Sequence, residues 1–423
     1  MKPIHIAAAT IGNALAFYDF FIYSFFLTQL GQAFFSAESA YLSVMKSLAT
    51  YGVGFLTRPL GAYIIGNYSD RKGRRSAMVL CSVLLGCATA GMAVIPSYSQ
   101  IGIAAPALFV IARMVQGFAL GGEIGPSTAY LAEAASPTRR GFVVSWQMVS
   151  QNVALVAAGL VATFLTSVLT SEQLAANAWR IAFFIGAAAV PFGWWLRTSI
   201  PETLHAEEAR ARVVHRPRLH EALMHSRTFG LGLIVLSAGA ISYSIFNYIV
   251  TYAKIELRLP AWAGSMAETS GYALGVPMAL LGGWLSDRYG RRPINLIGNG
   301  VFLGLIYPAF AWITATRSEI ALIVGMTTLI GAASFMWGSF FAGLAESVPA
   351  AIRGFSVGIV YSVAIALFGG TTPVVTKWLI CVSGSAMVPA WCLIGATTLG
   401  QIALWLMAET APVRLARVKS VFT

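Results

Sequence analysis

Long apolar stretches recur from one end of the chain to the other, separated by short charged segments. Each stretch reaches the length of about 20 residues that an α-helix needs to cross a bilayer. Lipid offers no hydrogen-bond partner to backbone N–H and C=O groups, so such a chain must satisfy these groups inside helices. Twelve spans are predicted, at residues 6–30, 46–68, 76–96, 104–131, 142–169, 179–197, 228–252, 264–286, 294–314, 320–345, 354–377 and 386–408.

Charged residues make up 10% of the chain, against about 25% in soluble domains. The first stretch exceeds the apolar core of a signal peptide and contains Asp19, which indicates an uncleaved first helix. The expected fold class is therefore an all-α membrane protein with twelve transmembrane helices. There is no glycine-rich nucleotide loop and no metal-ligand spacing in the sequence, so we expect no cofactor and no metal.

The 28 Lys and Arg residues are distributed by membrane side. With both termini in the cytoplasm, 20 of them, Arg197 included, fall on cytoplasmic segments and six on outer segments, while Arg58 and Arg113 lie inside spans. This asymmetry predicts a multi-pass plasma-membrane protein, in a bacterial inner membrane, with both termini cytoplasmic. The net charge of +12 is spread over these segments rather than gathered in one patch, which argues against nucleic acid as a partner.

The chain contains an internal repeat. Residues 66–75 and 283–292 share the pattern G-x-x-S-D-R-x-G-R-R, and two shorter motifs return at nearly the same offset. Those shorter pairs are 132–142 with 345–355, and 202–203 with 409–410.

Three ordered matches predict two six-helix bundles related by pseudo-symmetry. The expected domains are 1–197, a cytoplasmic linker at 198–227, and 228–423. Parallel halves with a site between them at mid-membrane are a common way to build alternating access.

The doubled loop motif, together with Arg113-x-x-Gln116-Gly117, resembles the major facilitator superfamily over the whole chain. Four further stretches are similar to the metabolite:proton symporters, which carry citrate, other di- and tricarboxylates, shikimate, and betaine or proline. These stretches are 12–23, 57–61, 113–123 and 179–181. One departure is Ala16, where that group usually has Glu in the pattern Glu-Trp-Tyr-Asp; this chain reads Ala16-Phe-Tyr-Asp19.

The repeated loops are expected to act as a conformational latch. A carboxylate favours helix N-termini and arginine forks, and such contacts would break when the halves rock. The alternative is that the positive charges only signal topology. The expected latch residues are Asp70, Arg71, Arg74, Glu133, Arg140, Asp287, Arg288, Arg291, Glu346 and Arg353.

Four ionisable residues lie well inside predicted spans: Asp19, Arg58, Arg113 and Glu123. Each costs about 2.5–3.5 kcal/mol at a helix centre on insertion scales, so each is expected to face the interior and to have a function. Arg113 is the first candidate for binding an anionic substrate, and a fixed structural ion pair is its alternative. For Arg58, a substrate contact and a structural pair with Glu123 or a carbonyl are both open.

Asp19 and Glu123 are the proton-coupling candidates, with Asp19 preferred. Burial favours the neutral form of a carboxyl group and a neighbouring arginine favours the charged form, so a change of neighbour suffices to load or release a proton. Polar and aromatic side chains inside spans are the remaining substrate-binding candidates, although each also suits helix packing. They are Tyr23, Gln116, Gln147, Gln151, Asn247 and Trp337.

The function expected is proton-coupled import of a small organic anion, a di- or tricarboxylate such as citrate, by a monomer in the lipid bilayer. Its partners are that substrate and protons. A betaine or proline symporter would need aromatic caging of a quaternary amine. A drug/proton antiporter fits intramembrane arginines less well, and the loss of a carboxylate at Ala16 also leaves open a non-transporting sensor on the same fold.

Overall fold

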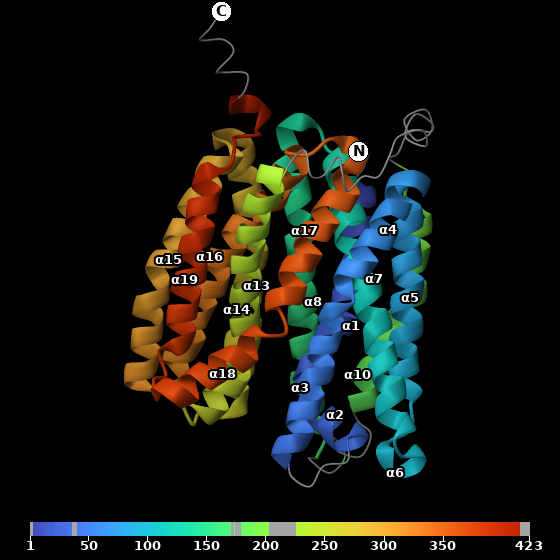
Figure 1. Ribbon diagram of the computed structural model, residues 1–423, viewed down its shortest axis with the longest axis vertical. Coiled ribbons are helices and arrows are strands. Elements are labelled where there is room, and N and C mark those ends of the chain that lie inside the picture. Colours follow the sequence, from blue (N-terminus) through green and yellow to red (C-terminus); the bar gives the residue numbers. More distant parts are fainter. Residues whose placement is uncertain (1–2, 36–39, 171–172, 174–178, 203–225, 415–423) are drawn as a thin grey trace, which may run out of the picture.

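The computed structural model describes residues 3–35, 40–170, 173, 179–202 and 226–414, and throughout these ranges the regular elements are helices. They form two bundles that lie side by side along the long axis (Figure 1). Most of the predicted linker, residues 203–225, lies outside the described residues, as does the tail after Arg414.

The first bundle holds the helices that precede the linker. They are α1 (Pro3–Phe25), α2 (Leu27–Phe34), α3 (Ala40–Leu56), α4 (Arg58–Lys72), α5 (Arg74–Val94), α6 (Tyr98–Ile101), α7 (Ala104–Ala134), η1 (Pro137–Arg139), α8 (Arg140–Val168) and α10 (Trp179–Thr198).

The second bundle repeats this order of long helices. It contains α13 (Ser226–Ile255), α14 (Ala261–Tyr289), α15 (Arg291–Thr316), α16 (Glu319–Glu346), η3 (Ala350–Ile352), α17 (Arg353–Phe368), α18 (Thr372–Ser383) and α19 (Val388–Leu406). Within the described residues, 10 helical segments are long and apolar enough to cross a membrane. The helices α3–α4 and α14 occupy the other two predicted spans. The prediction of an all-α membrane protein is confirmed.

Three predicted spans differ from the structure in how they end or break. The span at 6–30 ends as α1 at Phe25, and the span at 46–68 is divided between α3 and α4. The span at 354–377 is divided between α17 and α18. Both divided spans restart with a proline in the first turn of the second helix. Proline lacks an N–H and its ring clashes with the preceding turn, so a helix restarts there more easily than it continues.

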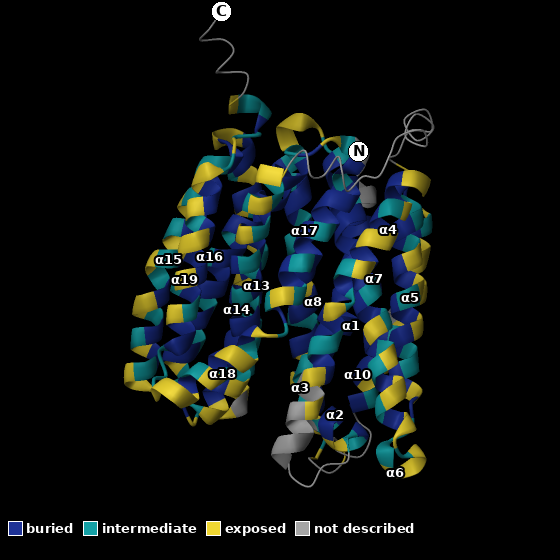
Figure 2. Cartoon of the chain, viewed as in Figure 1, coloured by how far each residue is buried: buried dark blue, intermediate teal, exposed yellow. Residues whose placement is uncertain are grey.

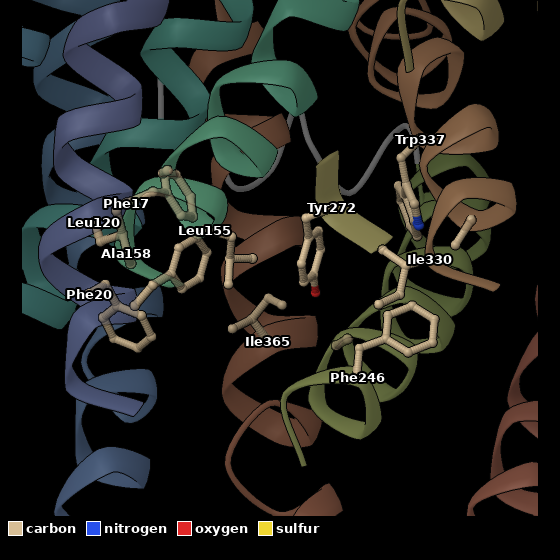
Figure 3. Packing of buried hydrophobic residues seen from close by; sticks show 14 of the residues in the cluster. Phe17, Phe20, Leu120, Leu155, Ala158, Phe246, Tyr272, Ile330, Trp337 and Ile365 are labelled. Carbon is tan, nitrogen blue, oxygen red and sulfur yellow. The ribbon is translucent and has the colours of Figure 1, made fainter. Parts of the chain in front are cut away.

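The helices pack through their inner sides and leave large apolar side chains on the outside. Figure 2 shows buried residues on the inward-facing sides and exposed residues around the periphery. Ile103, Phe164 and Trp405 are among the exposed apolar side chains. Figure 3 shows Phe17 and Phe20 of α1 on one side of the buried cluster, Ile330 and Trp337 of α16 on the other, and Tyr272 of α14 between them.

The two bundles meet along two seams. In one seam α14 packs against α8, and in the other α17 packs against α4 and α7. Gly125 of α7 allows a close approach in the second seam, because a Cβ added there would overlap the carbonyl oxygen of Gly354. The chain enters and leaves at the same end of the molecule (Figure 1). We call the end with Pro3 and Arg414 the terminal end, and the opposite end the distal end.

Candidate functional site

Two buried arginines lie at the centre of the candidate site. Arg58 begins α4 directly after the break in that span, and Arg113 lies in the middle of α7. Their side chains are 2% and 0% exposed. Both guanidinium groups stack on the ring of Phe20, with the Cζ atom of Arg58 4.3 Å and that of Arg113 4.6 Å from the ring centroid. The two positive charges therefore share one aromatic ring from α1.

Aromatic rings, rather than carboxylates, surround these arginines. Arg113 also stacks on Tyr23 at 4.2 Å, and Arg58 on Phe55 at 4.6 Å. Within the part of the chain that the structure describes, neither arginine has a carboxylate within the 4.0 Å of an ion pair. The Nε atom of each, and Nη2 of Arg113, have no hydrogen-bond partner. The site thus holds two positive charges that the described residues do not neutralise by ion pairing.

A chain of hydrogen bonds connects Arg113 to Asp19. Nη1 of Arg113 donates to Oε1 of Gln116 at 2.7 Å, and Nε2 of Gln116 donates to Oγ1 of Thr89 at 2.8 Å. Thr89 in turn donates to Oδ2 of Asp19 at 3.0 Å. Asp19 is 2% exposed and its Oδ1 has no partner. A change at Arg113 is therefore passed to a buried carboxyl group through two side chains.

Asp19 also lines a cleft between α1, α5 and α10. The cleft has room for about one water molecule, and Ala16 is part of its wall. Ala16 is the position where the metabolite:proton symporters usually have Glu. Ala16 thus borders a small opening beside Asp19, whose other lining residues are apolar except for Ser82.

Glu123 forms an ion pair that corrects the predicted place of Arg197. Arg197 was expected on a cytoplasmic segment, but it is 0% exposed and lies inside the first bundle. Its Nη2 and Nη1 donate to the two carboxylate oxygens of Glu123 at 2.5 and 3.0 Å. Nη1 also reaches the Met78 carbonyl at 2.7 Å and the Ser82 hydroxyl at 2.5 Å. The partner of Glu123 is therefore Arg197 and not Arg58.

The second bundle supplies tyrosines to the same region. Tyr243 of α13, Tyr272 of α14 and Tyr361 of α17 are buried or nearly so, and Tyr361 lies in interaction range of Arg58. Tyr51 of α3 joins the two sets, because it interacts electrostatically with Arg58, Arg113 and Tyr243. The hydroxyl of Tyr272 has no hydrogen-bond partner among the described residues, and those of Tyr51 and Tyr243 have only each other within reach. Buried polar atoms normally have partners, so this group is suited to a ligand or to water.

The same region contains a carboxylate that sequence reasoning missed. Glu268 of α14 is 3% exposed and its Oε1 has no partner. It lies only four residues inside the predicted span at 264–286, so its depth was not evident from its position. The signal that identifies it is the i, i+4 spacing to Tyr272, which puts both polar side chains on one face of a lipid-depth helix.

The other candidates for substrate contact divide into two groups. Gln147 donates to Asn13 at 3.2 Å, and Asn247 donates to the Tyr243 carbonyl of its own helix at 2.8 Å. The amide nitrogens of both are engaged within their own bundles, whereas their amide oxygens have no partner among the described residues. Trp337 is 9% exposed and packs on Gly239 of α13.

Gln151 of α8 belongs to the second group. Its side chain is 8% exposed and its amide nitrogen has no partner, so it has a hydrogen bond to offer.

The repeated loops form a symmetric network at the terminal end. Asp287 accepts from the backbone N–H groups of Gly141 and Phe142 at 2.8 and 2.9 Å, which are the first turn of α8 in the other bundle. Asp70 accepts from the Phe355 N–H of α17 at 3.2 Å. Each aspartate thus caps a helix of the opposite bundle, at the end where the helix dipole is positive.

Arginines and glutamates complete the network. Within the bundles, Arg74 pairs with Asp70 and with Glu133, and Arg291 pairs with Asp287 and Glu346. Across the bundles, Arg140 reaches Glu346 at 3.4 Å and Arg353 reaches Glu133 at 3.5 Å.

Two of the expected latch residues lie outside this network. Arg71 is exposed, and Arg288 is exposed and stacks on Trp284 at 3.8 Å. Their positions at the membrane surface are typical of topology signals.

The third repeated motif also has a structural role that the sequence did not reveal. Glu202 accepts from the backbone N–H groups of Arg74 and Arg75, at the start of α5, at 2.8 and 3.2 Å. Glu409 does the same for Arg291 and Arg292 at the start of α15, at 2.8 and 3.1 Å. Glycines with φ of 114° and 105°, Gly73 and Gly290, make the turns that bring these N–H groups forward.

Comparison with known proteins agrees with this architecture. The family model described as Major Facilitator Superfamily matches residues 9–373. A citrate-proton symporter of Salmonella typhi is 35% identical over 93% of this chain and 91% of its own length. One of Klebsiella pneumoniae is 33% identical over 97% and 93%. A putative proline/betaine transporter of Staphylococcus aureus (strain MSSA476) is 30% identical over 93% and 86%.

Solved structures share the fold. The proton:xylose symporter XylE bound to 6-bromo-6-deoxy-D-glucose superposes with a TM-score of 0.75 at 19% identity, over 96% of each chain. The human organic anion transporter MFSD10 (TETRAN) superposes with a TM-score of 0.66 at 18% identity, over 96% of this chain and 100% of that one. With its two bundles, repeated loops and full-length relatives, the chain belongs to the Major Facilitator Superfamily of twelve-helix membrane transporters.

Proposed function

We propose that this transporter is a proton-coupled symporter of small organic anions with two or three carboxylate groups, such as citrate. The observation that carries the proposal is the pair Arg58 and Arg113, which are both buried against Phe20 and have no ion-paired carboxylate among the described residues. The relatives named citrate-proton symporter support this choice.

Burying an uncompensated charge is costly, and removing one partner of a buried pair typically costs about 3–5 kcal/mol. The ring of Phe20 offsets part of this cost for both guanidinium groups. The remaining N–H donors, Nε of both residues and Nη2 of Arg113, have the geometry to hold a carboxylate. A substrate with two carboxylates would neutralise both arginines at once.

Asp19 is our candidate for the coupling proton. The path through Gln116 and Thr89 links its charge to the occupancy of Arg113. Glu123 is the second candidate, but its pair with Arg197 favours the charged form, because an adjacent cation stabilises a carboxylate. We therefore assign the transported proton to Asp19 and a structural role to Glu123.

We place the chain in a bacterial inner membrane as a monomer, with both termini in the cytoplasm. The terminal end would then face the cytoplasm, and the network of Asp70 and Asp287 would be a cytoplasmic gate in its closed state. Opening that gate requires each aspartate to release a helix of the opposite bundle. Substrate entering from outside would meet Arg58 and Arg113 before this gate opens.

A zwitterion such as betaine or proline is the second candidate, because one group of relatives is named for these substrates and Glu268 would be a counter-charge for an ammonium group. A quaternary ammonium group is usually held by aromatic faces. Here the faces of Phe20, Tyr23 and Phe55 are already covered by the two guanidinium groups. This favours the anion.

The test is uptake into proteoliposomes with labelled citrate, succinate, glycine betaine and proline. We expect uptake of a carboxylate that rises when the outside is acidic and collapses with an uncoupler, because entry of the proton drives entry of the anion. Exchange across the membrane without a gradient separates a transporter from a non-transporting sensor.

Variants of the arginines identify the site. Arg58→Lys and Arg113→Lys remove the bidentate fork, worth about 1.5–3 kcal/mol per charged hydrogen bond, and should weaken substrate binding about 10- to 100-fold. The matched control is Arg139→Lys, an exposed arginine of η1. Unchanged carboxylate uptake in both arginine variants, or uptake of betaine alone by the wild type, would exclude the anion assignment.

A further inference from the structure

Glu268 is a buried carboxyl group that has no ion-pair partner among the described residues. It is 3% exposed, two turns from the start of α14, and its Oε1 has no hydrogen-bond partner. Carboxylates inside transmembrane segments are costly and mark functional positions by default. An unpaired one at this burial is stable only if it is protonated or if a ligand or water solvates it.

Within the described parts of the chain, the surroundings of Glu268 contain polar groups but no cation within ion-pair distance. Tyr272 follows it one turn later on α14, and Tyr51 of α3 faces it from the other bundle; both interact with it electrostatically. The described charged residues of α8, α13, α15 and α16, which pack against α14, all lie more than 4.0 Å from it. The titratable groups that interact with it electrostatically include the hydroxyls of Tyr51 and Tyr272, which are neutral at physiological pH.

Tyr51 connects Glu268 to the arginines. The same tyrosine side chain interacts electrostatically with Arg58, with Arg113 and with Glu268. Its ring stacks on Tyr23 with centroids 5.5 Å apart, which fixes its position beside Arg113. Tyr51 thus lies between Glu268 of the second bundle and the two arginines, while Asp19 of the first bundle is linked to Arg113 through Gln116 and Thr89.

The charges of this region can be counted. Two arginines contribute two positive charges, and Asp19 and Glu268 contribute two carboxyl groups. With both carboxyl groups protonated the site carries a charge of two, which a dicarboxylate neutralises. With both carboxyl groups ionised, their charges cancel those of the two arginines, and the site no longer favours a dianion. Loading and release of substrate therefore follow the loading and release of two protons.

We propose that Glu268 is a second proton-binding site of the transport cycle, loaded together with Asp19 when a dicarboxylate occupies Arg58 and Arg113. This inference rests on the proposed anion symport. The proton binds to a carboxylate oxygen of Glu268 from the outer solution and leaves to water on the other side of the membrane, so that no other bond is made or broken. Because Asp19 and Glu268 belong to different bundles, protonation of both carboxyl groups requires both bundles to be close to the bound substrate.

The test is the number of protons that move with each substrate molecule. Wild-type protein and Glu268→Gln are reconstituted with a pH indicator inside the liposomes, and proton and labelled succinate influx are measured together. We expect two protons per succinate for the wild type, one for Glu268→Gln, and two for Glu268→Asp. A gradient of about one pH unit drives about tenfold accumulation per coupled proton. Accumulation should therefore fall about tenfold in Glu268→Gln while exchange without a gradient continues.

The control is Glu319→Gln, a carboxyl group in the first turn of α16, which should keep the wild-type ratio. An unchanged ratio in Glu268→Gln overturns the inference, as does a wild-type ratio of one, because Asp19 alone then suffices. A wild-type ratio of one overturns the inference even where the variant does not fold. Glycine betaine binding that Glu268→Gln abolishes would also overturn it and assign Glu268 to a cationic substrate. Wild-type uptake that ignores pH would instead refute the proposed function.

Discussion

Replacing Asp287 with Asn should shift the transporter away from the state with a closed terminal end. Asp287 accepts two backbone hydrogen bonds from the first turn of α8, at 2.8 and 2.9 Å, and these bonds cross between the bundles. Its pair with Arg291 lies within one bundle and stays when the bundles separate. The cross-bundle bonds alone therefore bias the equilibrium between states.

The magnitude follows from the two bonds. A hydrogen bond to a charged group contributes about 1.5–3 kcal/mol. Asn keeps the shape and one acceptor oxygen, but it loses the charge and the second acceptor. The expected loss is about 2–3 kcal/mol, which changes the ratio of closed to open molecules about 30- to 150-fold. Arg291 keeps Glu346 as a partner at 3.1 Å, so the second bundle should remain folded.

The assay is the distance between spin labels at the distal end, where the bundles approach when the terminal end opens. Ile103 and Val382 are exposed residues of opposite bundles and suit labelling, in a background without the native cysteines. We expect Asp287→Asn to increase the population with the shorter distance. Glu319→Gln, in the first turn of α16, serves as the control. An unchanged distribution in Asp287→Asn would refute the latch.

Two further substitutions test the packing. Glu123→Gln leaves Arg197 buried without a counter-charge and should lower the free energy of unfolding by about 3–5 kcal/mol. Thermal unfolding of the purified protein measures this loss, and a midpoint equal to that of the wild type would contradict a stabilising Glu123–Arg197 pair. Gly125→Ala adds a methyl group against the carbonyl of Gly354 and should favour the state with an open terminal end in the same spin-label assay, whereas Gly52→Ala, which has free space around it, should not.

The repeated loop motif predicted the terminal end of the molecule closely. An aspartate and an arginine four residues apart around a glycine turn have little freedom, so their mutual contact follows from local geometry. The cross-bundle targets of Asp70 and Asp287 depend instead on how two halves dock, and a single sequence does not contain that information.

Arg197 and Glu268 show why part of the site was missed. Arg197 lies at the end of the sixth span, where an arginine is usually a topology signal. The fold turns it inward because Glu123, 74 residues earlier in the sequence, needs a cation. Glu268 lies near the start of its span, and only the packing of α14 against α8 and α16 reveals that it is buried. The depth of a residue along a transmembrane helix can be counted from the sequence. The direction in which its side chain points around the helix depends on the neighbouring helices, which the sequence does not show.

The breaks in α3–α4 and α17–α18 have a mechanical consequence. They lie in the same seam, whereas α8 and α14 of the other seam run without interruption. The outer segments α3 and α18 can therefore tilt on their own while α4 and α17 stay locked by the aspartate network. Continuous rods such as α8 and α14 transmit any movement over their full length. Bending of α3 and α18 at these breaks would thus open the distal side without a rigid-body rotation of the two bundles.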